Sequence, residues 1–493
     1  MSSTSHPVSV PLYICDAYAS EHFKGNQTAV CMVPSSVYCM EWSGVKSLEA
    51  SFGRGEPDHT TQTEEERAAE AQAYADERDA KMGRAFQSIA RELNVGECAF
   101  VYRIPAAREK DILDKIRVKV NEFEKEYEER VREEESRQMN ALLSTEEEGG
   151  GRGLAQYEAP AGMVQGVSFS ITSFGASFLQ TQQMSMIASG NTANVRRPRR
   201  MYTQWFGLRW FTPMQEHVFC GQAAIAAAHT IFECARFFHL KSSRHLVNNV
   251  PVEFFIPTQT DVLCFVTRAG IISVRYKETN GAGTGAHHNP REGNTAVETY
   301  EVHFPANEAV SVQEMLPSGF KAGLAEALGL ANGAADIDDI ALSAPLSLYV
   351  AVLKNAAAVR HCRVQEAALR GVFTGPDFTT ARQQHPRLAT PHALVITAEN
   401  DGGEAQILTR VFTPWIGVLE DSVSSFAYTA LLPFWLRRLN GSYKVGDKLV
   451  FYQASKRGGS VRGIIIGKKA DRVALIGSVI TFLRGNAMFD VED

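Results

Sequence analysis

The sequence predicts a mixed α/β (α+β) protein built from two similarly constructed halves. Its composition is that of a soluble globular chain, since 44% of the 493 residues are hydrophobic and 22% are charged. Short β-rich segments alternate along it with segments of helical periodicity. The tripeptide Phe-Thr-Pro ends a β-rich segment twice, at 211–213 and 412–414, and a short loop and a helical segment follow each copy. A chain of this length has room for two to four domains.

The N-terminal elements are short strands and one amphipathic helix. Strands are expected over residues 8–17 and 28–33, because both stretches are rich in β-forming residues. Residues 82–93 carry apolar side chains every three or four positions, which predicts a helix with one buried face. A turn ends that helix, and a strand is expected over 98–103. Glu97 therefore lies between two rigid elements that fix the direction of its side chain.

Each Phe-Thr-Pro copy is followed by a helix. An alanine-rich helix is expected from about residue 222 to 238, and an apolar helix from 426 to 439. Further strands are expected over the ranges 262–276, 299–304, 347–354 and 393–398.

Two stretches are interpreted as insertions, at about 44–81 and 104–205. The second contains a charged segment, 108–135, whose apolar residues recur every three or four positions and predict an amphipathic helix. The basic run 196–200 is interpreted as a basic loop rather than a localisation or anion-binding patch. The glycine-rich segment 281–294 is interpreted as a hairpin connection, because its GAGTG run lacks the Lys-Ser/Thr of a phosphate loop.

Charge and cysteine usage exclude several classes of protein. Lys and Arg total 50 against 56 Asp and Glu, so a net charge of −6 gives no global attraction to nucleic acid. The eight cysteines form no Cys-x-x-Cys pair, so a structural zinc site is not expected. No apolar run approaches the roughly 20 residues that span a bilayer, and no secretory signal opens the chain. The sequence therefore predicts a cytoplasmic protein that binds neither membrane nor nucleic acid.

Five blocks of sequence, in order along the chain, resemble one family. They are FKGNQTAV (23–30), IARELNVGECAFV (89–101), LRWFTPMQEHVFCGQAAIAAAH (208–229), RVFTPWIGVLEDSVSSFAYTALLPFW (410–435) and RVALIGSVITFLRG (472–485). Together they resemble the PhzF-like phenazine-biosynthesis proteins, which share the diaminopimelate epimerase fold. The blocks come from both halves and leave the two insertions outside the resemblance.

The resemblance implies two pseudo-symmetric domains, each a curved sheet around a central helix, with the active-site cleft between them. The first would span 1–305, including both insertions, and the second 306–493, with its last strands crossing back to the first. The resemblance also implies a homodimer that uses no metal or organic cofactor. The partner would be a small carboxylate-bearing substrate.

The resemblance further assigns the site residues. Glu97 matches the catalytic Glu of the family and would be the general acid/base, a role typically worth about 10²–10⁴ in rate. Asp421 matches the family's second acidic residue and would orient a substrate amine or hydroxyl. Two helices, beginning near 221 and 424, would point free N–H groups at the substrate carboxylate. The remaining substrate-binding residues implied are Asn26, Cys220, Gly221, Gln222, Ser424, Ser425 and Tyr428.

This chain departs from the family pattern at the same site. Where the family has Cys-Gly-His-Ala-Thr the chain has CGQAA at 220–224, and Gln222 cannot titrate as histidine does. The Gly-Ser pair of the second motif is Ser425-Phe426, and its histidine is Tyr428. The Gly-Asn-Pro of the family is Gly-Asn-Gln at 25–27.

Three functions stay open on this basis. The first is a PhzF-like isomerase in which Glu97 moves a proton on a small amino- or hydroxy-acid-like carboxylate. The second is a catalytically silent relative that binds a ligand or serves in assembly. The third is a thiol-based epimerase or racemase using Cys220, with Ser424 at the opposing position, although serine is a poor base at neutral pH.

Overall fold

The computed structural model describes most of both halves and little of the insertions. The described residues are 7–38, 80–104, 170–171, 202–217, 220–240, 242–268, 270–277 and 298–490. The helix expected at 108–135, the basic run 196–200 and the loop 281–294 lie outside them. The chain divides into two compact units, the first containing 1–103, 205–258 and 264–493, and the second 104–204 and 259–263. The expected domain boundary near 305 falls inside the first unit and stays a prediction.

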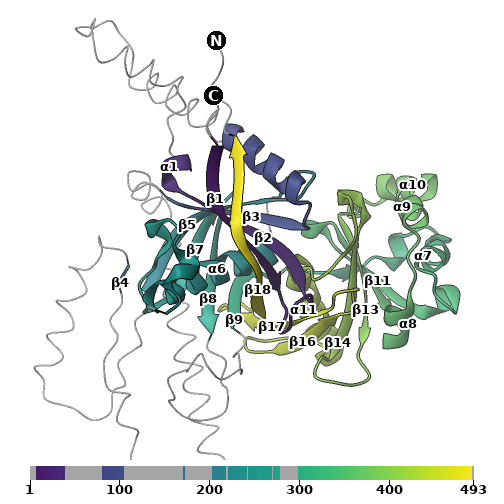
Figure 1. Ribbon diagram of the computed structural model, residues 1–493. Coiled ribbons are helices and arrows are strands. Elements are labelled where there is room, and N and C mark those ends of the chain that lie inside the picture. Colours follow the sequence, from purple (N-terminus) through teal and green to yellow (C-terminus); the bar gives the residue numbers. More distant parts are fainter. Residues whose placement is uncertain are drawn as a thin grey trace, which may run out of the picture. The chain divides into compact units, whose positions relative to one another are not determined.

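The described chain is an α+β structure rich in strands (Figure 1). Its strands are β1 (Pro7–Ala17), β2 (Asn26–Val33), β3 (Glu97–Arg103), β4 (Ser170–Ile171), β5 (Tyr202–Phe211), β6 (Glu216–His217), β7 (Thr260–Thr267), β8 (Gly270–Lys277), β9 (Thr299–Pro305), β10 (Val310–Ser311), β11 (Ile337–Ser343), β12 (Leu348–Leu353), β13 (Ala393–Glu399), β14 (Ile407–Thr413), β15 (Val418–Asp421), β16 (Lys448–Gln453), β17 (Gly459–Ile466) and β18 (Arg472–Asp490).

The described helices lie between these strands along the chain. The α-helices are α1 (Ser35–Tyr38), α6 (Gly221–His239), α7 (Phe320–Leu328), α8 (Ala356–His361), α9 (Glu366–Thr374), α10 (Pro376–Gln384) and α11 (Ser425–Asn440), and residues 80–93 are also helical. Short 3-10 turns are Arg244–Val247, Val252–Phe254, Gln313–Met315, Gly333–Asp336, Ala344–Leu346 and Pro414–Ile416. No helix of the described residues is long and apolar enough to cross a membrane. In the second unit, β4 pairs in parallel with Tyr202 and Thr203.

The strand order of the first half recurs in the second. β2 pairs antiparallel with β1 and parallel with β3, and β3 pairs antiparallel with β5. Likewise β12 pairs antiparallel with β11 and parallel with β13, and β13 pairs antiparallel with β14. The long strand β18 joins the halves, because it pairs with β17, with β9 and, along its later residues, with β1 beside it in Figure 1.

The face predicted for the N-terminal helix is confirmed as buried. Met82, Phe86 and Ile89 pack into a core with strand residues of β3 and β5. The Phe86 and Phe100 rings stack with their centroids 4.1 Å apart, and Phe211 meets the Phe100 ring edge-on at 5.4 Å. This aromatic contact fixes the helix that leads into Glu97 against the strand that leads into the first Phe-Thr-Pro.

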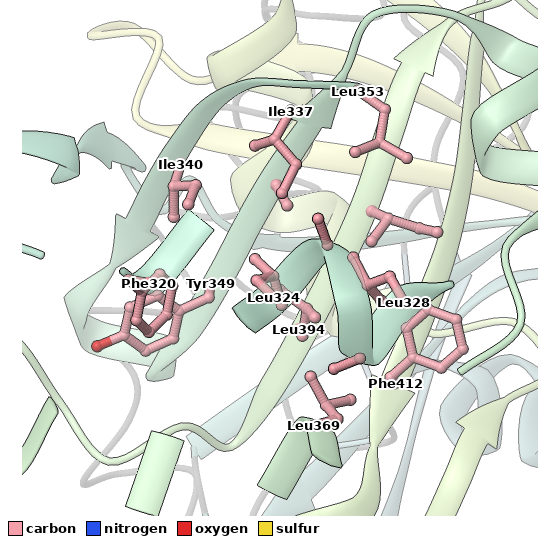
Figure 2. Packing of buried hydrophobic residues seen from close by; sticks show 14 of the residues in the cluster. Phe320, Leu324, Leu328, Ile337, Ile340, Tyr349, Leu353, Leu369, Leu394 and Phe412 are labelled. Atoms are coloured by element: carbon pink, nitrogen blue, oxygen red, sulfur yellow. The ribbon is translucent and has the colours of Figure 1, made fainter. Parts of the chain in front are cut away.

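A second core lies under α7 to α10, which gather beside β11 and β13 in Figure 1. Leu324 and Leu328 of α7 are fully buried among strand side chains such as Ile340 and Leu394 (Figure 2). Phe412, in the second Phe-Thr-Pro, is buried in the same cluster. Each Phe-Thr-Pro therefore anchors a strand end in its own core.

Candidate functional site

The candidate residues lie on two strand-to-helix connections, which we call elbows and which have the same order of elements. In the β6–α6 elbow, β5 is followed by the short strand β6 and then by α6, and Trp210 pairs with His217. In the β15–α11 elbow, β14 is followed by β15 and then by α11, and Val411 pairs with Asp421. His217 therefore occupies the register position in the first elbow that Asp421 occupies in the second.

The same ion pair supports each elbow. Arg209 donates from Nε and Nη2 to the two Glu216 carboxylate oxygens, at 2.8 and 2.9 Å. Arg410 donates in the same bidentate way to Glu420, at 2.7 and 2.9 Å. Because bidentate pairs fix orientation as well as position, each elbow presents its next residue in a defined direction.

Glu97 is the first residue of β3 and is buried with little hydrogen bonding. It follows a turn in which Asn94 adopts a positive φ of 48°. Its Oε1 lies 3.6 Å from Nδ1 of His217, and its Oε2 has no hydrogen-bond partner among the described residues. Burial, and then the nearby Asp421 carboxyl, raise the pKa of Glu97 well above its usual value, while a hydrogen bond with the Cys220 thiol opposes the rise.

Asp421, in contrast, is surrounded by donors. Asn26 donates from Nδ2 to its Oδ1 at 2.8 Å and to the Val423 carbonyl at 3.0 Å, which ties β2 to the β15–α11 elbow. Burial raises the pKa of Asp421, and the Ser424 hydroxyl and the backbone N–H groups of Ser422 and Val423 oppose that rise. The predicted neighbours Asn26 and Ser424 are therefore both at this carboxyl group.

The two carboxyl groups differ in which protonation state their surroundings favour. Hydrogen-bond donors stabilise a charged carboxylate, and Asp421 has several of them. Glu97, in contrast, is buried and lies near the carboxyl group of Asp421, and both features disfavour its charged form. The surroundings therefore favour the protonated form more strongly at Glu97 than at Asp421.

His217 is a member of this site that the sequence analysis missed. Burial and the neighbouring His392 lower the pKa of His217 to about 4, so its imidazole is neutral at pH 7. The Nε2 atom has no hydrogen-bond partner among the residues described. A sequence signal existed, since His217 lies three residues before Cys220 as Asp421 lies three before Ser424.

The starts of α6 and α11 cap each other. The Gln222 N–H donates to Ser425 Oγ at 3.1 Å, and the Ser425 hydroxyl and N–H donate to Gln222 Oε1 at 2.5 and 3.4 Å. The Ser424 N–H donates to Gln453 Oε1 at 3.0 Å. These three N–H groups are therefore not free for an anion, contrary to the expectation, because side chains of the opposite helix and of β16 satisfy them.

Tyr428 supports the elbow from within the protein. It is fully buried, and its hydroxyl donates to Gln453 Oε1 at 3.0 Å and lies 3.1 Å from Thr409 Oγ1. Gln453 in turn donates to the Asp421 carbonyl at 2.6 Å. Tyr428 therefore contacts the site indirectly, because it positions Gln453 and Gln453 binds the backbone carbonyl of Asp421.

Gly221 is the point of closest approach between the two helix starts. A Cβ at this position would lie 2.5 Å from Ser425 Oγ and 2.8 Å from Cζ of Phe304. We expect Gly221→Ala to separate the two helix starts and to lower the free energy of unfolding by about 1–3 kcal/mol through overpacking. Urea denaturation measures the change. Gly323→Ala is the control, since the nearest atom to a Cβ there, on Val372, is 3.5 Å away. Equal stability of the two variants would contradict the prediction.

No group of three or more His, Cys, Asp or Glu side chains that could hold a metal ion occurs within the described part of the chain.

Several known proteins are similar to this chain in sequence or in fold. An uncharacterized isomerase of Halalkalibacterium halodurans is 24% identical over 287 residues, covering 58% of this chain and 80% of that protein. An uncharacterized isomerase of Pseudomonas aeruginosa is 27% identical over 312 residues, covering 62% and 87%. The crystal structure of a PhzF-family phenazine biosynthesis protein from Bacillus anthracis has a TM-score of 0.50 at 12% identity, covering 98% of this chain and 100% of that chain, which shows a shared fold. The family model of the PhzC-PhzF phenazine biosynthesis-like proteins matches residues 174–485, more than half of the chain. The chain therefore belongs to the phenazine biosynthesis-like family.

Proposed function

We propose that this protein is a PhzF-like isomerase that moves a proton on a small amino- or hydroxy-acid-like carboxylate, with Glu97 as the general acid/base. The observation that carries the proposal is the setting of Glu97, a buried carboxyl group whose pKa is raised well above its usual value by burial and then by the nearby Asp421 carboxyl group. Two relatives that are named isomerases support the class of reaction. The family match begins at residue 174, so the role of Glu97 rests on its geometry.

The finer architecture is part of the proposal. The repeated strand order and the two equivalent elbows support two pseudo-symmetric epimerase-like domains, with Glu97 supplied by the first and Asp421 by the second. In this arrangement Asp421 would accept hydrogen bonds from a substrate ammonium or hydroxyl group. The substrate carboxylate would take the place of Ser425 Oγ and Gln222 Oε1 at the helix N–H groups.

A thiol-based epimerase fits the site less well. Burial, and then the neighbouring Glu97 carboxyl, raise the pKa of the Cys220 thiol well above its usual value. The thiol therefore keeps its proton at neutral pH, whereas a cysteine base must be a thiolate. A silent binding protein is the second candidate, because the Gln222–Ser425 contacts occupy the helix N–H groups that a substrate carboxylate would need.

Solvent deuterium exchange tests the proposal. The full chain is incubated in D₂O with a panel of small amino and hydroxy acids, and mass spectrometry follows deuterium in the recovered acids. An isomerase is expected to introduce deuterium at a carbon of at least one acid, and heat-inactivated protein is not. Ligand-induced thermal stabilisation without any exchange would overturn the isomerase and favour the binding protein.

A further inference from the structure

We propose that Glu97 and His217 form a dyad that shares one proton, in which His217 accepts the Glu97 carboxyl proton at Nδ1 and donates from Nε2 to the substrate. The dyad deepens the proposed isomerase function and rests on it for its catalytic role. It makes His217 a second catalytic residue and gives the site an acceptor for the Glu97 proton.

The geometry of the pair carries the proposal. The atoms His217 Nδ1 and Glu97 Oε1 are 3.6 Å apart, and the two side chains are only 13% and 11% exposed. At the far ends of the pair, Nε2 of His217 and Oε2 of Glu97 are buried and find no hydrogen-bond partner in the part of the chain that the structure describes. Buried polar atoms without a partner are unfavourable, and a substrate bound here would satisfy both.

A protonated Glu97 needs such an acceptor before it can act as a base. The other titratable groups near it are Cys220, Asp421, the buried thiol of Cys98 and, beyond His217, His392. The Cys220 and Cys98 thiols already hold their protons, because burial raises the pKa of both, and Asp421 accepts from Asn26. His217 is the neutral imidazole whose Nδ1 lies nearest to the carboxyl group, so it is the available acceptor.

The proton balance closes without another reactant. The Glu97 carboxyl gives its proton to His217 Nδ1, and the mutual attraction of the carboxylate and imidazolium so formed offsets the raised pKa of Glu97 and the lowered pKa of His217. The carboxylate then takes a proton from the substrate carbon next to the carboxylate or carbonyl group, and the electron pair of that C–H bond delocalises onto the substrate oxygen. The imidazolium Nε2–H donates to this oxygen and stabilises its charge. Glu97 returns the proton to a second carbon, and His217 then returns its own proton to Glu97.

Nuclear magnetic resonance tests the resting state of the dyad without any substrate. The full chain is labelled with ¹⁵N-histidine, and the His217 signals are identified by their loss in His217→Gln. We expect Nδ1 to be unprotonated and Nε2 protonated at pH 7, because the Glu97 hydroxyl faces Nδ1. In Glu97→Met, which keeps the volume without the donor, the ¹⁵N signal of Nδ1 is expected to move toward that of an imidazole nitrogen that accepts no hydrogen bond. A proton on Nδ1 in the wild type, or an unchanged Nδ1 signal in Glu97→Met, would overturn the dyad.

Deuterium exchange then separates the dyad from the proposed function. With an acid that the wild type labels, His217→Gln is expected to lower the exchange rate by about 10²–10⁴. The control is His303→Gln, which removes another buried histidine paired with a carboxylate, Glu301 at 2.6 Å, and is expected to exchange normally. Retained exchange in His217→Gln with loss in Glu97→Gln would overturn the dyad and leave the isomerase standing. Absence of exchange in the wild type would overturn the isomerase, and the magnetic resonance experiment would then decide the dyad by itself.

Discussion

Replacing Glu97 with Gln is expected to remove proton exchange and, at the same time, to stabilise the folded protein at neutral pH. The amide has the shape of the carboxyl group but cannot take up and return a proton, so exchange should fall by about 10²–10⁴. The rate is measured with any acid that the wild type labels in D₂O. Loss of activity together with a gain in stability is the signature of a group kept in an unfavourable environment for its chemistry.

The gain in stability follows from the sign of the pKa change. The pKa of Glu97 is raised in the folded protein, so the unfolded chain releases this proton at lower pH than the folded one. Stability is therefore lost as the pH rises above the unfolded pKa, until the folded pKa is reached, by about 1.4 kcal/mol for each unit between the two values. Gln has no proton to release. The Glu97→Gln variant should therefore have a larger free energy of unfolding than the wild type across this pH range.

Urea denaturation between pH 4.5 and 8 measures the effect. The matched control is Glu92→Gln on the exposed face of the helix over residues 80–93, which is expected to change stability by less than about 0.5 kcal/mol. If Glu97→Gln were less stable than the wild type throughout, the carboxylate would have a structural role and the proposed chemistry would be wrong.

Sequence reasoning succeeded where local pattern and burial agree. The helical spacing at 82–93 predicted a buried face, and Met82, Phe86 and Ile89 occupy it. The repeated Phe-Thr-Pro predicted two strand-to-helix connections, and both elbows are present. In these cases the residues that define the element also bury its apolar face, so the signal lies within a short window of sequence.

Contacts between segments that are far apart in the sequence could not be predicted from such local patterns. The mutual capping of Gln222 and Ser425 joins residues 203 positions apart, and neither side chain indicates its partner. His217 became a site residue only because β6 brings it to Glu97. Helices α7 to α10 were not predicted either, because each has nine residues or fewer and so shows too short a periodic pattern.

Replacing Asp421 with Asn is expected to move the pH dependence of exchange to lower pH and to destabilise the fold. The negative charge of Asp421 raises the pKa of Glu97, so its removal lowers that pKa and Glu97 ionises at lower pH. In Asp421 the carboxylate accepts from the Asn26 amide and from nearby backbone N–H groups. In the Asn variant one of these two oxygens is replaced by an NH₂ group, which is a donor facing other donors. This loss of an acceptor is expected to lower the free energy of unfolding by about 1–3 kcal/mol.

The pH profile of deuterium exchange and urea denaturation measure the two effects of Asp421→Asn separately. Asp401→Asn is the control, because that side chain is 75% exposed and its replacement should leave both measurements unchanged. A profile displaced to lower pH requires the carboxyl groups of Glu97 and Asp421 to act on each other across the site. An unchanged profile with reduced stability would mean that Asp421 only holds the β15–α11 elbow in place, and proton transfer by Glu97 would then depend on burial and His217 alone.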